Sequence, residues 1–346
     1  MTSTKPLLAV PNVSEGRDQA TIEAVATAFA TDGKARLLDV HSDPDHHRSV
    51  FTLAGSQGDL AGALVAGTRA AIERIDVGKG RAPAEIGAHP HVGAVDVIPL
   101  VYLDPAQRGA ACAEALVVAH EVGEGLGVPV FLYGELAQGR TRAELRRGGV
   151  AGMAERLGAG ELRPDFGPLR LHPSAGATLV AAREPLVAFN MELAAPATLA
   201  DAKRIAAAIR EGGSAGLPGV RAIGVPLGGT GPRRERAEAE DAELQEAELQ
   251  EAEAVASRKR APNARTRARA QDTPLRDMIP QVSTNVERPL EVPLRTVVEA
   301  VRKHAEIVRV ELVGLAPQAA LEGLPGDLVF VGGDPAAQII ENALGF

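Results

Sequence analysis

Apolar and polar positions alternate in short segments along the first half of the chain, with longer helical patterns between them. The alternation and the short aliphatic runs predict β-strands at residues 7–13, 36–41, 48–54, 92–100 and 128–133. Apolar residues spaced three and four apart predict helices at 18–30, 60–75 and 104–126. Asp18 and Asp104 suit the N-cap position, Pro105 suits the first helical position, and the box Thr141-x-x-Glu144 predicts the start of a further short helix.

The second half repeats one order of elements, strand–helix–strand–strand–helix–strand. The pattern predicts strands at 185–193, 220–227, 279–288 and 309–315, and helices at 199–211 and 294–308. The first of these helices begins with the box Thr198-x-x-Asp201. This order favours an α+β fold of two ferredoxin-like βαββαβ subdomains, at 1–182 and 183–330, followed by a tail at 331–346. Two such sheets facing each other would enclose a substrate cleft.

A low-complexity block at 228–277 separates the two middle strands of the second half. Residues 235–253 hold nine acidic side chains against a single arginine, and residues 258–269 hold six basic side chains and no acid. The acidic part has strong helix formers but only Leu244 and Leu249 as larger apolar residues, so a helix there would bury little. We expect a solvated insertion at a hairpin tip; a partner-binding or RNA-contacting arm is the alternative.

Composition narrows the class of protein. The 346 residues suffice for about two domains, and 45% hydrophobic with 24% charged residues is ordinary for a globular chain. A net charge of -8 with nine aromatic residues argues against nucleic-acid binding. The single Cys112 excludes an intramolecular disulfide and suits a reducing cytoplasm, while apolar runs are too short for a signal peptide or a membrane span. A homodimer is compatible with the sequence, which does not decide the oligomeric state.

Three segments concentrate polar groups. The turn from Asp39 to Arg48 contains three histidines and three aspartates, which suits a metal site in residue type but follows no fixed ligand spacing, so a solvated hairpin loop is the simpler reading. His89 lies before Pro90 and ahead of an apolar strand, a position that suits a proton-transfer group. Asp96, on that strand, needs a partner if it is buried. The Gly- and Pro-rich stretch 164–177 predicts either a ligand-binding loop or a plain connection.

The motifs, taken in order, resemble those of glutamate formimidoyltransferases, the formiminotransferase-domain family. The motifs that carry the resemblance are Pro-Asn-Val-Ser-Glu-Gly at 11–16, Leu-Leu-Asp-Val at 37–40, the segments 87–96 and 130–135, the loop 164–178, Ala-Phe-Asn at 188–190, Gln-Val-Ser-Thr-Asn at 281–285 and Leu-Val-Gly-Leu at 312–315. The resemblance covers about residues 6–320 apart from the insertion. Ala88 stands where the family's Gly-Glu-His-Pro motif has Glu, and His172 and Ala175 stand where other members have Val and Trp.

The resemblance implies transfer of the formimino group from N-formimino-L-glutamate to N5 of tetrahydrofolate, a step of histidine degradation. Tetrahydrofolate is then the cosubstrate, with no metal required, and the two subdomains enclose a folate tunnel. The family's active-site histidine falls on His89, which would act as a general base and then as an acid. The family's folate-binding loop falls on Gly167, Pro168, Leu169, Arg170, Leu171, His172, Pro173, Ser174, Ala175 and Gly176. We expect no cyclodeaminase domain.

Four further roles are inferred from residue chemistry and not from the resemblance. Asp39 or Asp96 is the candidate for orienting His89, and Arg48 or Arg183 for pairing with substrate carboxylates. Three alternatives stay open: formyl transfer between 5-formyltetrahydrofolate and glutamate, a folate-binding protein without catalysis, and a metal-dependent hydrolase that uses residues 39–47.

Overall fold

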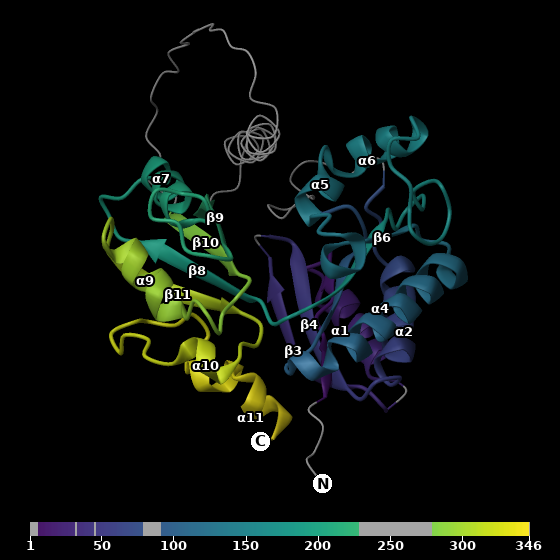
Figure 1. Ribbon diagram of the computed structural model, residues 1–346, viewed down its shortest axis with the longest axis horizontal. Coiled ribbons are helices and arrows are strands. Elements are labelled where there is room, and N and C mark those ends of the chain that lie inside the picture. Colours follow the sequence, from purple (N-terminus) through teal and green to yellow (C-terminus); the bar gives the residue numbers. More distant parts are fainter. Residues whose placement is uncertain (1–5, 32, 45, 79–90, 228–278, 346) are drawn as a thin grey trace, which may run out of the picture.

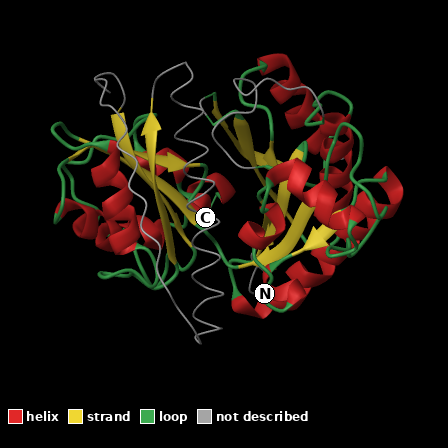
Figure 2. Ribbon diagram, turned by 90° about the horizontal axis from the view of Figure 1, so that it is seen from above, coloured by secondary structure: helices red, strands yellow, loops and turns green. Residues whose placement is uncertain are grey.

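Two β-sheets face each other, each with helices packed on its outer face (Figures 1 and 2). This computed structural model describes residues 6–31, 33–44, 46–78, 91–227 and 279–345. The predicted insertion at 228–277 and His89 therefore lie outside the described residues. None of the described helices is both long and apolar enough to cross a membrane.

The first sheet takes its strands from residues 7–183. Its strands are β1 (Leu7–Ala9), β2 (Asn12–Val13), β3 (Arg36–Asp43), β4 (Arg48–Gly55), β5 (Val95–Val101), β6 (Val130–Leu132) and β7 (Thr178–Arg183). At one edge of the sheet β3 pairs with β4, and β4 pairs in turn with both β1 and β2. These two short strands pair with β5, β5 pairs with β7, and β7 pairs with β6 at the other edge. Pairing is antiparallel up to β5, whereas β5, β7 and β6 are parallel to one another.

Three helices cover the outer face of this sheet: α1 (Gln19–Phe29), α2 (Leu60–Ile72) and α4 (Arg108–His120). They bury an aliphatic core that contains only a few aromatic rings, among them Phe29 against Phe51 with ring centroids 5.1 Å apart. Asp18 caps α1 by accepting a hydrogen bond from the Ala20 amide. The N-terminus of α2 is capped from α4, because the buried Glu114 carboxylate accepts the amides of Gly58, Leu60 and Ala61.

The inner face of the first sheet is only partly covered. Two short helices, α5 (Arg142–Arg146) and α6 (Gly149–Gly158), pack over β6 and β7, where they bury Phe131, Leu145 and Met153. A 3-10 turn, η3 (Gly134–Ala137), leads into them. The part of the inner face made by β3, β4 and β2 is left to the second sheet.

The second sheet has the element order predicted from the sequence. Its elements are β8 (Val187–Leu193), α7 (Leu199–Ile209), β9 (Val220–Leu227), β10 (Ile279–Val286), α9 (Leu294–Arg302) and β11 (Ile307–Val313). The strand order is β11-β8-β10-β9, with antiparallel pairing throughout. Along β8, Phe189 and Met191 enter the core under the helices, so Asn190 and Glu192 point to the opposite, inner face.

The last segment crosses from the second sheet to the first. After α10 (Gln318–Leu321) the chain forms a 3-10 turn, η4 (Pro335–Gln338), and the helix α11 (Ile340–Leu344). Gln338 Nε2 donates to the carbonyl oxygens of Leu312 and Gly314, which holds the segment to the second sheet. Ile340 and Leu344 are buried in one cluster with Leu8, Ala54 and Val101 of the first sheet. Residues predicted to form a tail therefore connect the two halves.

Local prediction was wrong in several places. The predicted helix 294–308 is too long, because α9 ends at Arg302 and β11 already begins at Ile307. The predicted strand 7–13 is interrupted because Pro11 has no amide hydrogen, and β1 and β2 are separate. The predicted helix 104–126 is divided into a 3-10 turn η1 (Pro105–Gln107), α4 and a π-helical turn η2 (Glu121–Gly125). Neither β7 nor α6 was predicted: β7 follows the irregular loop directly, and α6 begins at a glycine pair, which is a weak helix start.

Candidate functional site

Charged side chains of β3 and β4 project from the inner face of the first sheet. Phe51 and Leu53 of β4 point into the core under the helices. Because side chains alternate along a strand, Arg48 points to the opposite face of the sheet, which faces the second sheet. The register places Asp39 opposite Thr52, His41 opposite Val50 and Asp43 opposite Arg48. Strand pairing thus puts Asp39, His41 and Arg48 on one surface.

The second sheet presents polar side chains to that surface. Asn190, Gln281 and Glu311 come from β8, β10 and β11, and Asn190 and Gln281 are only 2% and 1% exposed. Glu311 Oε1 lies 3.5 Å from His41 Nε2, and Asn190 Nδ2 donates to Glu311 Oε2 at 2.9 Å. The contact with His41 and the hydrogen bond from Asn190 lower the pKa of the Glu311 carboxyl although burial opposes them. Glu311 is therefore an anion at neutral pH, at the contact between the two halves.

Two hydrogen-bond acceptors on the strands of the two sheets are enclosed and unpaired among the described residues, Asp39 Oδ2 on β3 and Gln281 Oε1 on β10. Burial raises the pKa of Asp39, and the charge of His41 opposes that rise only in part. The turn after β11 lies close by, since a Cβ built on Gly314 would be 4.0 Å from Asp39 Oδ2. Enclosed acceptors of this kind are costly to a fold unless a ligand satisfies them.

Two half-buried arginines belong to the first sheet, Arg48 at the start of β4 and Arg183 at the end of β7. Burial lowers the pKa of Arg48. The negative charges of Asp43 and Glu311 oppose this decrease, whereas the positive charges of Arg146 and Arg142 add to it. Burial likewise lowers the pKa of Arg183 to about 10. The Nε atoms of Arg48 and Arg183 are enclosed without a hydrogen-bond partner in the described ranges. The charge of Arg142 acts unfavourably on both guanidinium groups. Guanidinium groups with free donors in such a positive environment suit a carboxylate-bearing ligand.

The Asp96 carboxylate is buried, and both of its oxygens have a hydrogen-bond partner. Its Oδ1 accepts the Val92 amide at 2.7 Å, and Arg146 pairs with its Oδ2. The ion pair joins β5 to α5 and holds the start of the strand. Whether Asp96 also orients His89 remains a prediction, because His89 lies outside the described residues.

The histidine-rich turn at 39–48 is a hydrogen-bonded hairpin end. His46 Nδ1 is 2.5 Å from Asp43 Oδ2, and His47 Nδ1 accepts the Gly16 amide at 3.1 Å. Within the described ranges no group of three or more His, Cys, Asp or Glu side chains is arranged to hold a metal ion.

The loop 167–176 is held in place by backbone contacts at both ends. Gly167, at φ 82°, donates its amide to Glu124 Oε1 at 2.9 Å, and His172 and Gly176 exchange backbone hydrogen bonds. Gly93 forms a bridge with Gly176, so the loop lies against the segment that leads into β5. Leu169 is 63% exposed at the middle of the loop.

Comparison with known proteins identifies the family of the chain. Residues 7–183 match the family model described as the formiminotransferase domain, N-terminal subdomain. The chain belongs to the formiminotransferase family. It is 40% identical over 222 residues to glutamate formimidoyltransferase of Streptococcus pyogenes serotype M1, which covers 63% of this chain and 72% of the relative. It is 37% identical over 206 residues to the enzyme of the same name from Thermoplasma acidophilum, covering 58% and 66%.

Bifunctional relatives match over the same part of the chain. The formimidoyltransferase-cyclodeaminase of Sus scrofa is 39% identical over 211 residues, which are 59% of this chain but only 37% of the pig protein. The alignment thus spans about a third of the bifunctional relative. The predicted resemblance is confirmed, and the chain is a transferase of the formiminotransferase family.

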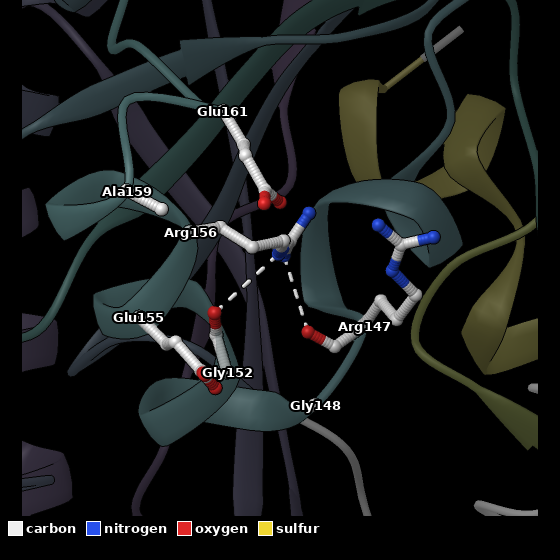
Figure 3. Close-up of a pocket in the computed structure, with 7 residues that line it drawn as sticks. All are labelled: Arg147, Gly148, Gly152, Glu155, Arg156, Ala159 and Glu161. Atoms are coloured by element: carbon white, nitrogen blue, oxygen red, sulfur yellow. Dashed lines mark hydrogen bonds between the residues drawn. The ribbon is translucent and has the colours of Figure 1, made fainter.

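A surface pocket of this formiminotransferase lies between α5 and α6, apart from the residues described above (Figure 3). Arg156 donates there to the carbonyl oxygens of Gly152, Leu145 and Arg147. These bonds close the C-terminal end of α5, which gives the guanidinium a structural role.

Sequence reasoning placed Asp39, Arg48, Asp96 and Arg183 in the formiminotransferase site but missed other residues at the contact of the sheets. The missed residues are His41, Asn190, Gln281 and Glu311. Polar residues inside otherwise apolar strands, such as Asn190 and Gln281, were the available signal. His41 lay within the histidine-rich segment 39–48, although no role was assigned to it, whereas Glu311 carried no local signal.

Proposed function

We propose that this protein transfers the formimino group of N-formimino-L-glutamate to N5 of tetrahydrofolate in the cytoplasm, giving 5-formimidoyltetrahydrofolate and L-glutamate. The observation that carries the proposal is the family match over residues 7–183, the half that supplies Asp39, Arg48 and Arg183. The two relatives named glutamate formimidoyltransferase support the same activity.

The reaction needs proton transfer at two nitrogens. N5 must lose a proton as it attacks the formimino carbon, and the departing glutamate nitrogen must gain one. We assign the first transfer to His89, the histidine that matches the family motif. Asp39 is the better candidate for orienting it, because the Asp96 carboxylate is already held by Val92 and Arg146, whereas Asp39 Oδ2 is unpaired.

The donor carries two carboxylates, and the first sheet offers two half-buried arginines. Arg48 and Arg183 come from β4 and β7 of the same sheet and each retains an unpaired Nε. Binding of a carboxylate to each would satisfy these donors and relieve the repulsion that Arg142 exerts on both. A dicarboxylic donor therefore fits the charge balance of the site.

Tetrahydrofolate also fits the available groups. We propose that two ferredoxin-like subdomains enclose a tunnel for it between the facing sheets, with the loop 167–176 on one side. The unpaired acceptors Asp39 Oδ2 and Gln281 Oε1 suit the N–H donors of a pterin ring, and exposed Leu169 suits its flat face. The cosubstrate supplies the nucleophilic N5, and the protein residues orient it and move protons.

The test is to incubate the purified protein with tetrahydrofolate and N-formimino-L-glutamate while following the pterin absorbance. A parallel reaction with 5-formyltetrahydrofolate and glutamate separates formimino from formyl transfer. We expect faster turnover of the formimino donor, with the rate unchanged after exhaustive chelation. Tight folate binding without turnover of either donor would instead indicate a folate-binding protein.

A further inference from the structure

Three histidines of the β3–β4 hairpin differ in what holds their rings. His46 is bound to Asp43 and His47 to the Gly16 amide, so both imidazoles serve the hairpin end. His41 instead points from β3 to the second sheet, with its side chain about 20% exposed. Its Nε2 is enclosed and makes no hydrogen bond within the described residues.

The nearest charged group to His41 belongs to the other half of the molecule. Glu311 Oε1 is 3.5 Å from Nε2, and Asn190 fixes the second oxygen of that carboxylate at 2.9 Å. Asn190 and Glu311 are direct partners in the β8–β11 register, so this carboxylate stands on a rigid sheet. The other charges that act on the pair are Asp39 and Asp43 on β3 and Arg48 on β4.

A carboxylate 3.5 Å from one nitrogen of an imidazole leaves the other nitrogen for proton transfer. This arrangement orients the ring and stabilises the imidazolium. The His41 ring shares its strand face with Asp39, whose Oδ2 is unpaired in the described part of the chain.

We propose that His41 is the general acid of the formimino transfer, oriented by Glu311 and Asn190 of the second sheet. The inference rests on the proposed function. It means that the site is complete only when both halves contribute, since β3 supplies the imidazole and β11 supplies the carboxylate.

The step balances with two histidines. N5 attacks the carbon of the protonated formimino group, the C=N π pair moves to the terminal nitrogen as the N5–C bond forms, and the N5 proton passes to the base, His89. The terminal nitrogen then returns its pair to re-form the C=N bond while the bond between the carbon and the glutamate nitrogen breaks. The pair of that broken bond goes to the glutamate nitrogen, which the His41 imidazolium protonates. Glutamate leaves as the amine, and the two imidazoles return to their starting states by proton exchange with water.

The test compares His41→Asn and Glu311→Gln with His304→Asn, a control at an exposed histidine after α9. We expect His41→Asn to lower kcat by roughly 10²-fold, the usual contribution of one acid–base group. Its tetrahydrofolate dissociation constant should stay within about threefold, since the acid acts on the leaving nitrogen. Glu311→Gln should lower kcat less than His41→Asn does and leave KM for both substrates nearly unchanged, because it removes the group that orients the imidazole and not the acid itself.

Circular dichroism and thermal unfolding of each variant exclude misfolding as the cause. If His41→Asn keeps more than half of kcat across the pH range while the wild type is active, the inference is wrong and the proposed function stands. A wild-type kcat in Glu311→Gln, or a loss that appears only in KM, contradicts the positioning role of the carboxylate. A wild-type protein without formimino transfer overturns both proposals.

Discussion

At the scale of single residues, Asp43 shows how neighbours decide a charge. Burial alone would raise the pKa of its carboxyl, but hydrogen bonds and charge from His46, with the charge of Arg48, hold that pKa well below its usual range. A carboxyl with a lower pKa in the folded protein stabilises the fold above its unfolded pKa of about 4. That stabilisation is lost as the pH falls toward the folded pKa.

Asp43→Asn should therefore lower the free energy of unfolding by about 1–3 kcal/mol at pH 7, the usual value of hydrogen bonds to a charged group. The difference from the wild type should shrink steadily below pH 4. Urea unfolding at pH 7, 5 and 3 measures it. Asp59→Asn is the control, because the Asp59 side chain makes no capping hydrogen bond to α2. A difference that does not change between pH 7 and pH 3 would contradict this account of the Asp43 charge.

His89→Ala should keep the fold and folate binding but lose turnover by roughly 10²–10⁴-fold, which is about 3–5 kcal/mol of transition-state stabilisation. The prediction follows from the motif position of His89. Steady-state kinetics with a parallel folate titration measures both effects. A variant with more than half of the wild-type kcat would exclude the role.

At the scale of elements, the predicted folate loop depends on one close backbone approach. A Cβ built on Gly93 would lie 1.8 Å from the Ala177 carbonyl oxygen and 3.0 Å from that of Ala175. The Ser14 hydroxyl donates to the Gly93 carbonyl at 2.7 Å, so this backbone is fixed from the other side as well. The backbone before β5 therefore cannot shift to make space for a side chain at position 93.

Gly93→Ala should displace the loop, cost about 1–3 kcal/mol of stability and weaken tetrahydrofolate binding. Gly109→Ala in α4 is the matched control, because its Cβ meets nothing within 4 Å and alanine favours a helix. Thermal unfolding and folate titration of the two variants give the comparison. Wild-type folate affinity in Gly93→Ala would show that the loop does not bind folate.

At the scale of the whole molecule, the halves are held together from two sides. One contact is the polar surface around His41 and Glu311, and the other is α11, whose Ile340 and Leu344 pack on the first sheet. Arg36 adds a hydrogen bond to the Ala343 carbonyl at 3.0 Å. The apolar contact of α11 thus sets the spacing at which the polar groups meet.

Ile340→Asp should loosen this contact, because it replaces a buried apolar side chain worth about 1.5–3 kcal/mol by an unpaired carboxylate. We expect a lower unfolding midpoint and a severalfold higher KM for the formimino donor. Leu290→Asp, at a 62% exposed position, is the control and should change neither quantity. Equal KM values for both variants would show that α11 does not position the site.

Replacement of residues 231–273 by a short Gly/Ser linker should leave soluble expression and kcat/KM nearly unchanged. Lengthening a surface connection costs only about 0.6 kcal/mol per doubling, and the block has little apolar surface to bury. Limited proteolysis of the wild type should cut within residues 258–269. Loss of soluble expression, or a fall in kcat/KM beyond about tenfold (~1.4 kcal/mol), would make the block part of the structure or the site.

The sequence alone was enough for most elements and for the types of chemistry. Capping residues such as Asp18 and Thr198 start their helices where predicted, because a cap acts on amides two or three residues away. The order of elements in residues 183–315 could likewise be predicted from the local periodicity of apolar residues. Motif order further led to the correct family, since motifs are local by nature.

Only the tertiary structure decided which side chains meet. β7 was missed because its strand character comes from burial between β5 and β6, not from its own pattern. The contact of His41 with Glu311 joins residues from the two ends of the chain through the facing of two sheets, and no local spacing encodes such a pairing. Burial of Asp96 implied that its carboxylate has a partner, but the sequence could not say which one. Arg146 is that partner because α5 packs over the first sheet.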